Sequence, residues 1–212
     1  MEKATREFFD KRGPVVVKNL QKHHFEAYYC ATKAEALSQV LALMPAGSTV
    51  GWGGAISAAQ VGVQKAVHAG DYKVIDRDRF SDPAEKLRCM RECFNADFFI
   101  TGANAISLDG QMVNIDGNGN RVGMIVYGPK NIIVVAGMNK VCASLEDAVK
   151  RARTVAAPMN QQRFALNNPC TCTGVCGNCL NETSICNQIL ITRNCKPAGR
   201  IKFVLVGEEL GF

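Results

Sequence analysis

The chain has 212 residues, of which 47% are hydrophobic and 21% are charged. This length and balance predict one well-buried domain of soluble composition spanning residues 1–212. The formal net charge of +6 comes from basic residues dispersed along the chain, without a basic stripe carrying interleaved aromatic residues. The composition therefore favours a small anionic ligand as a partner, or a charge that serves only solubility, and we expect no nucleic-acid partner.

Neither a membrane span nor an export signal is expected. The longest apolar runs, such as 131–137, have the length of strands and end at glycine, far short of a membrane-spanning helix. The N-terminal residues 1–13 are charged and helix-forming, and they lack the apolar core of a signal peptide. The sequence predicts a cytoplasmic protein.

Short β-branched runs alternate with helical patterns along the chain. In chain order, we expect strands at residues 25–30, 49–52, 73–76, 97–101, 131–135, 189–192 and 201–206. Helical patterns run from 33 to about 44, over 55–69, from 82 and from 144, and Thr32, Asp82 and Ser144 are candidate N-caps. Strands separated by helices of this length form right-handed βαβ units. The sequence predicts the α/β class, with an open, mostly parallel, Rossmann-like sheet.

The first glycine-rich turn, residues 50–57, follows a predicted strand and leads into a helix. Ligands of parallel sheets bind at such turns, where glycine lets the backbone approach a ligand and helix-start amides attract an anion. We expect Gly53, Gly54 and Ser57 to bind a ligand. A tight turn that serves only helix–sheet packing explains the glycines equally well.

The second glycine-rich region, residues 101–128, combines a hairpin with a loop of Gly and Asn. Asp109–Gly110 predicts a tight turn between two short strands, and residues 116–121 then alternate glycine with polar side chains. The predicted ligand-binding amides are Asn104, Asn114, Asn118 and Asn120. A polar loop that satisfies its own hydrogen bonds is the alternative.

Asp116 and Arg121 are the predicted catalytic residues of that loop. Arg121 has the geometry to grip a carboxylate or phosphate bidentately, and Asp116 would act as a base or hold Arg121 in place. The spacing G-x-G-x-x-x-G differs from the dinucleotide fingerprint, and no acidic residue ends the next strand. We therefore expect no nicotinamide cofactor.

The cysteines predict a metal site. Six of the ten lie between residues 170 and 195, within a Cys-rich segment, residues 168–196, called the Cys segment below. Cys176 and Cys179 form a C-x-x-C pair, flanked by Cys170 and Cys186, and four thiolates at this spacing suit either zinc or a [4Fe–4S] cluster. Cys172 and Cys195 are alternates. Disulfides, unligated thiols and a thiol redox pair are the competing readings.

Three runs together resemble the LUD-domain family, named for lactate utilisation. They are the run from Thr101 to Val141, the turn GWGGAIS and the closing GRIKFVLVGEELGF. Some members are also similar in carrying the pattern PC…TG…C..C…IC, matched here by Cys170, Cys176, Cys179 and Cys186. The chain departs from the family at Ala55, where relatives tend to have Ser or Thr.

The resemblance implies a fold similar to the sugar-phosphate isomerase and CoA-transferase group. It also implies a role in the bacterial oxidation of lactate to pyruvate, alongside iron–sulfur partner proteins. In that role the chain would be a subunit of an oxidoreductase, and its cysteines would hold an Fe–S cluster or Zn. Two other functions stay open. One is a non-redox enzyme acting on phosphorylated or CoA-linked molecules with a structural metal site, and the other is a non-catalytic assembly module.

Overall fold

The computed structural model describes residues 1–164 and 166–212 and contains two β-sheets. In the larger sheet six strands run parallel to one another in the order β1-β10-β7-β4-β2-β3. The strands are β1 (Glu26–Cys30), β10 (Ile201–Val206), β7 (Asn131–Gly137), β4 (Phe98–Thr101), β2 (Thr49–Trp52) and β3 (Lys73–Ile75). The predicted parallel sheet is confirmed.

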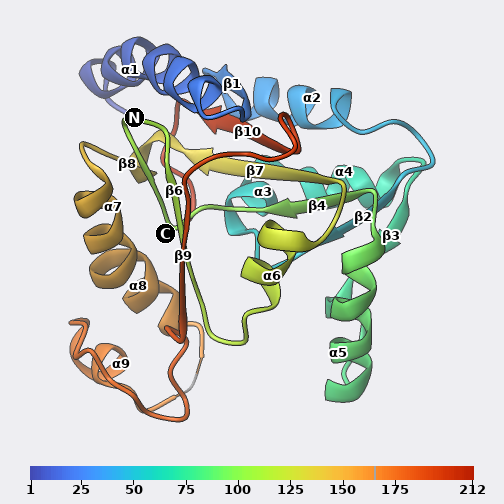
Figure 1. Ribbon diagram of the computed structural model, residues 1–212, viewed down its shortest axis with the longest axis vertical. Helices are drawn as coiled ribbons and strands as arrows, with labels where there is room; N and C mark the ends of the chain where they lie inside the picture. Colours follow the sequence, from blue (N-terminus) through green and yellow to red (C-terminus); the bar gives the residue numbers. More distant parts are fainter. Residues whose placement is uncertain (165) are drawn as a thin grey trace.

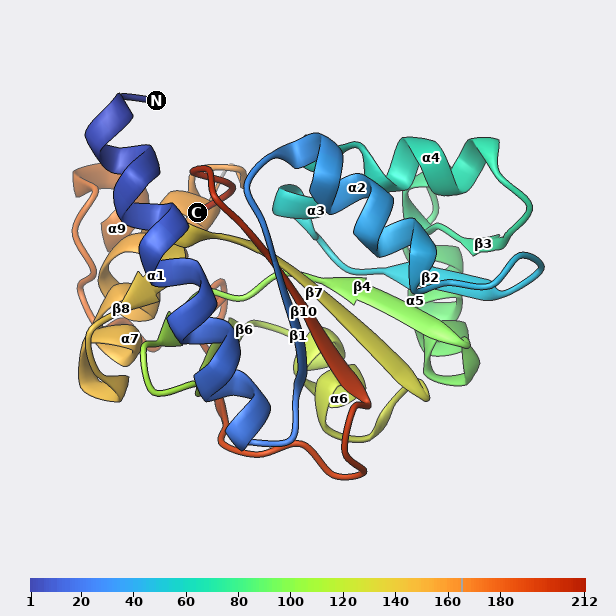
Figure 2. The same ribbon diagram turned by 90° about the horizontal axis from the view of Figure 1, so that it is seen from above.

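Helices cover both faces of this sheet. On one face lie α2 (Lys33–Ala42), α3 (Ile56–Val61) and α4 (Val63–Ala69), and on the other lie α1 (Lys3–Lys22), α5 (Pro83–Glu92) and α6 (Asn120–Tyr127). Figure 2 shows α2, α3 and α4 together on one side and α6 on the opposite side. Strand β7 contributes to the hydrophobic cores on both faces of the sheet. Ile132 and Val134 pack into the core on the side of α1, α5 and α6, and Ile133 and Val135 pack into the core on the side of α2, α3 and α4.

The predicted N-caps are confirmed by hydrogen bonds. The side chains of Thr32, Asp82 and Ser144 each accept the backbone N–H three residues ahead, at 3.2, 3.1 and 3.1 Å. The helix predicted over 55–69 is instead two helices, α3 and α4. Gly62 stands between them with φ of +91° and caps the end of α3 in the left-handed conformation, which stops the helix there.

The second sheet is small and mixed, with the order β8-β5-β6-β9. It contains β8 (Val141–Cys142), β5 (Ala105–Ser107), β6 (Met112–Asp116) and β9 (Gln188–Thr192). The predicted turn joins β5 to β6, and a Cβ on Gly110 would lie 2.8 Å from the backbone of Asn19 in α1. Glycine is therefore required where the hairpin meets that helix. Sequence periodicity did not predict that β9 pairs with β6, because alternation says nothing about a strand's partner.

The remaining helices lie along the second sheet. Helix α7 (Leu145–Arg151), a π-helical turn (Ala152–Ala156) and α8 (Ala157–Gln161) follow one another directly, and Ala148 and Ala152 pack against Ala105 and Val113 of the hairpin. Figure 1 shows α9 (Pro169–Thr173) beyond α8, at the far end of that stack. Among the described residues, no helix has the length and apolar character needed to cross a membrane.

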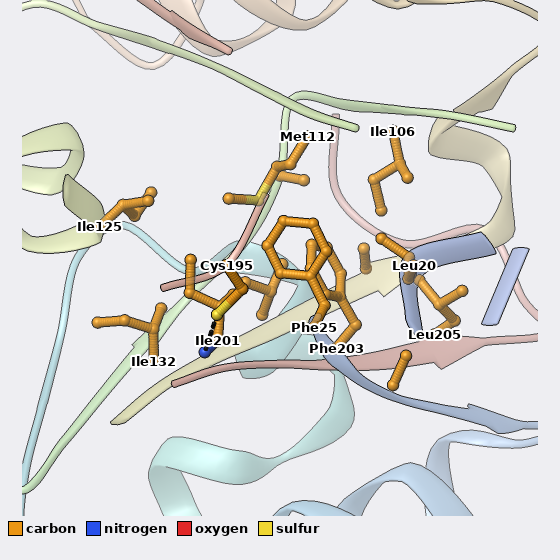
Figure 3. Close-up of a cluster of buried hydrophobic side chains, with 14 of the residues drawn as sticks. Leu20, Phe25, Ile106, Met112, Ile125, Ile132, Cys195, Ile201, Phe203 and Leu205 are labelled. Atoms are coloured by element: carbon orange, nitrogen blue, oxygen red, sulfur yellow. Dashed lines mark hydrogen bonds between the residues drawn. The ribbon is translucent and has the colours of Figure 1, made fainter. Parts of the chain in front are cut away.

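The hairpin and the large sheet share one core. Figure 3 shows Phe25, Met112 and Phe203 gathered there with Cys195. The rings of Phe25 and Phe203 meet edge to face, with centroids 5.2 Å apart. Cys195 is 3% exposed, and its sulfur accepts a hydrogen bond from the backbone N–H of Ile201 at 3.3 Å. This thiol is a packing residue at the start of β10.

Candidate anion pocket and cysteine cluster

A pocket of about 430 Å³ opens where the central parallel strands end. It lies beyond the carboxyl ends of β2, β4 and β7, the position at which open α/β sheets bind ligands. Both glycine-rich turns contribute to it. Of the predicted ligand residues, those that line it are Gly53, Gly54, Ser57, Asn104, Asp116, Asn118, Asn120 and Arg121.

Asn114 is the predicted ligand residue that does not line the pocket. Its side chain is fully buried in β6, and Nδ2 donates a hydrogen bond to the carbonyl of Gly102 at 3.0 Å. This bond ties the hairpin to the end of β4, so Asn114 supports the pocket's framework.

Arg121 is the second residue of α6, and three neighbours hold its side chain. Its Nη2 donates to Asn104 Oδ1 at 3.0 Å and to the carbonyl of Ile115, while Nε lies 3.7 Å from Asp116 Oδ2. Burial lowers the pKa of Arg121 and Asp116 opposes that shift, but an arginine stays charged in either case. Nη1 makes no hydrogen bond to any described residue, which leaves one face of the guanidinium for a ligand.

Asp116 caps the helix that carries Arg121. Its Oδ2 accepts the backbone N–H groups of Arg121 at 3.0 Å and Val122 at 3.2 Å. Of the two roles considered for Asp116, base or holder of Arg121, this geometry supports the second. The same carboxylate orients both the backbone and the guanidinium of Arg121.

Sequence reasoning missed three cationic side chains of the pocket. They are Arg77, Lys140 and Arg163. Together with Arg121 they outnumber the two lining acids, Asp116 and Glu182, so the lining favours an anion. Only the position of Lys140, three residues after β7, could have drawn attention to it, since ligands gather at strand ends. A lone lysine has no motif.

One wall of the pocket belongs to the Cys segment. Residues 182–185 line the pocket and also connect Cys179 to Cys186. The contact with the Gly/Asn loop is close. A Cβ on Gly117 would lie 3.1 Å from the Cα of Ile185, and Asn187 bonds through its backbone N–H to Asp116 O and through Nδ2 to Gly117 O, both at 3.0 Å. The Cys segment and the ligand loop therefore form one unit.

A buried asparagine organises the Cys segment. Asn168 is 1% exposed, and its Nδ2 donates to the carbonyl of Thr183 at 3.1 Å. Its Oδ1 accepts from Asn181 Nδ2 at 3.1 Å and from Thr183 Oγ1 at 2.9 Å. These bonds fold the chain back on itself, which brings residues just after 168 close to those around 180.

The fold-back gathers the four predicted ligand cysteines. Partial burial and the nearby sulfurs of Cys179 and Cys176 raise the pKa of the Cys170 thiol, and desolvation with the same kind of neighbours raises the pKa of Cys186. Four cysteine thiols are a donor set that zinc and iron–sulfur clusters accept. As the side chains stand, no three His, Cys, Asp or Glu residues in the described chain are arranged to hold a metal ion.

The two alternate cysteines are separate from this cluster. Cys172 is exposed and its sulfur lies 3.0 Å from Asn167 Oδ1, whereas Cys195 is in the core shown in Figure 3. Neither influences the thiols of Cys170 or Cys186. Cys170, Cys176, Cys179 and Cys186 remain the predicted ligand set.

The family model described as the LUD domain matches residues 14–206, which is nearly the whole chain. The chain belongs to the LUD domain family. This family is associated with lactate utilisation, and the match includes both the anion pocket's loops and the Cys segment.

Solved structures similar to this LUD domain are distant in sequence. A DUF162 family protein from Deinococcus radiodurans has 13% identity and a TM-score of 0.49, covering 95% of this chain and 97% of that one. Ribose 5-phosphate isomerase A from Neisseria gonorrhoeae has 17% identity and a TM-score of 0.35, covering 53% and 54%. The eIF2B beta subunit from Chaetomium thermophilum has 13% and 0.39, covering 54% and 44%. No curated protein matches the chain.

Proposed function

We propose that this LUD domain is a component of lactate oxidation to pyruvate that binds a small carboxylate in the anion pocket and a metal or iron–sulfur cluster at Cys170, Cys176, Cys179 and Cys186. The observation that carries the proposal is the shared wall. Residues 182–185 line the pocket and link two of the four cysteines. A bound carboxylate and a bound cluster would therefore lie against the same short stretch of chain.

The carboxylate is assigned to Arg121. Its guanidinium is held by Asn104 and Asp116, and Nη1 is left without a partner among the described residues. A fixed guanidinium of this kind recognises a planar anion with directional hydrogen bonds. The other lining arginines, Arg77 and Arg163, add attraction for the anion.

The cluster supplies electron transfer if it contains iron, and it only orders the Cys segment if the metal is zinc. Iron–sulfur partner proteins would then accept the electrons. The residues of this chain serve the first case by keeping the donor cysteines beside the pocket.

Metal analysis and an absorption spectrum of anaerobically prepared protein, before and after iron reconstitution, test the cluster. We expect visible absorption that is lost in Cys176→Ser and kept in Cys172→Ser, because only Cys176 belongs to the proposed set. A colourless protein containing zinc would exclude electron transfer by this chain. A protein that takes up neither metal would exclude the site.

Calorimetric titration with lactate and pyruvate tests the pocket. We expect saturable binding that is at least about tenfold weaker in Arg121→Gln, equivalent to about 1.4 kcal/mol. Arg193→Gln is the matched control, because Arg193 is exposed and outside the pocket. Equal affinities in the two variants would refute the assignment of Arg121.

A second candidate function is favoured by the pocket's size and charge. A volume of about 430 Å³ lined by three arginines and Lys140 also suits a phosphorylated or CoA-linked molecule handled without redox chemistry. Thermal stabilisation by sugar phosphates or CoA esters, but not by lactate or pyruvate, would favour this alternative.

A further inference from the structure

Lys140 is a buried amine without an acidic partner in the described part of the chain. It ends the short 3₁₀ turn Met138–Lys140 that follows β7, and it is 4% exposed. Its Nζ donates to Ser57 Oγ at 3.1 Å and to the carbonyl of Ala103 at 3.0 Å. Among the described residues no carboxylate forms an ion pair with it. Both of its partners are neutral, and the residue lines the anion pocket.

The surroundings of Lys140 favour the neutral amine. Burial, with the positive charges of Arg151 and Arg121, lowers the pKa of Lys140 to about 7. A desolvated lysine beside another cation has a free lone pair at neutral pH, which is the condition for a lysine to act as a nucleophile toward a carbonyl group. Lys202 has the opposite environment, because its Nζ lies 2.6 Å from Glu26 Oε2.

Arg121 is close enough to Lys140 for its charge to act on the amine, and both side chains line the same pocket. A ligand whose carboxylate binds Arg121 would therefore occupy the pocket that Lys140 also lines. The smallest ligands that present a carboxylate and an adjacent electrophilic carbon are 2-oxo acids.

We infer that Lys140 forms an imine with the carbonyl carbon of a 2-oxo acid whose carboxylate is bound by Arg121. This inference rests on the proposed function, since pyruvate is the 2-oxo acid of that reaction. The lone pair of Nζ forms the new carbon–nitrogen bond, and the carbonyl oxygen leaves as water with the two hydrogens of the amine. No oxidant or reductant takes part.

Ser57 holds the amine in place. Its hydroxyl accepts the hydrogen bond of Lys140 and donates to the carbonyl oxygen of Leu210 at 3.4 Å. A hydroxyl fixed between an amine and a backbone carbonyl orients the nitrogen. Ser57 is therefore a positioning residue for the same step.

The experiment is reductive trapping. The full chain is incubated with pyruvate and cyanoborohydride at pH 7, and lysine modification is mapped by peptide mass spectrometry. We expect a 1-carboxyethyl group on Lys140, formed at least about tenfold faster than on any other lysine and saturating at the pyruvate concentration that half-saturates binding. Lys140→Met should remove this modification, and Arg121→Gln should shift its saturation to about tenfold more pyruvate.

Calorimetry on the same samples tests the proposed binding of pyruvate separately from the formation of the imine. If pyruvate binds saturably while Lys140 is labelled no faster than Lys202, the imine is refuted and the carboxylate pocket stands. If pyruvate does not bind at all, both fail. Circular dichroism of Lys140→Met and of the conservative variant Lys140→Arg identifies any loss of folding, and Lys140→Arg in a folded state must also lose the label.

Discussion

The amide oxygen of Asn104 accepts two hydrogen bonds, one from Arg121 Nη2 at 3.0 Å and one from the backbone N–H of Ile115 at 2.9 Å. One side chain directly before β5 thus holds both the hairpin strand β6 and the guanidinium of the pocket. The position of Arg121 depends on a residue 17 positions earlier in the chain. The anion site and the small sheet are therefore coupled.

Asn104→Ala should weaken both the anion site and the small sheet. The substitution leaves the Ile115 N–H and one N–H of Arg121 without an acceptor, which costs about 1–3 kcal/mol of the free energy of unfolding, and it removes one of the three contacts that hold Arg121. We expect weaker binding of pyruvate in calorimetry, by about tenfold or 1.4 kcal/mol. Asn19→Ala is the control, because Asn19 Nδ2 donates to Leu108 O at 2.8 Å away from the pocket. Similar losses of affinity in both variants would contradict the role of Asn104.

Asp116→Ala should remove the cap of α6. Loss of a side-chain cap costs about 0.5–2 kcal/mol, measured as the free energy of unfolding in urea. Asp82→Ala removes an equivalent cap from α5, where Asp82 accepts Glu85 N–H at 3.1 Å outside the pocket. We expect both variants to lose similar stability and only Asp116→Ala to lose affinity for pyruvate. Unchanged affinity in Asp116→Ala would show that the carboxylate does not orient Arg121.

Gly211→Ala should disturb the Lys140–Ser57 pair. Gly211 has φ of +59°, and a Cβ there would lie 2.8 Å from Ser57 Oγ and 3.1 Å from Lys140 Nζ. Gly47→Ala is matched for backbone strain alone, since Gly47 has φ of +77° with nothing within 4 Å of the added Cβ. Each variant should lose about 1 kcal/mol of stability through the left-handed conformation. A further loss, and slower trapping of Lys140, are expected only for Gly211→Ala.

Stability should depend on pH through Lys140. Its pKa is about 7 in the folded protein, below the ordinary value of 10.5, so the unfolded chain binds more protons between these limits. Burying the charged amine of Lys140 lowers the free energy of unfolding, and this cost has its full value below pH 7. The cost declines as pH rises, by at most about 1.4 kcal/mol per pH unit.

Urea unfolding between pH 6.5 and 9 measures this dependence as the difference between the wild type and Lys140→Met. Buried thiols titrate at alkaline pH in both proteins, so the difference isolates the lysine. We expect the advantage of Lys140→Met to shrink as pH rises. Lys202→Met breaks the ion pair with Glu26 and should show no such trend. If the stability difference between the wild type and Lys140→Met stayed constant over this pH range, the amine of Lys140 would stay charged in the folded protein.

Local patterns in the sequence were sufficient for much of the fold. The strands of the large sheet and three helix starts follow from β-branched runs and from capping residues such as Thr32 and Asp82, whose hydrogen bonds span only three residues. The exception within a helix was Gly62, whose left-handed φ divides α3 from α4. The pattern of Ile132 to Val135 also predicted a buried strand, because every residue in it is apolar.

The sequence by itself determined the strands of the large sheet, the α/β class, the LUD motifs and the residue types of both candidate sites, but it did not predict helix α6. Only the tertiary structure decided which of these residues meet. The pairing of β9 with β6, the burial of Lys140 beside Ser57 and the use of residues 182–185 as a pocket wall join positions far apart in the chain. Hydrophobic periodicity does not predict such contacts, because it indicates which face of an element is buried and not which residues pack against that face.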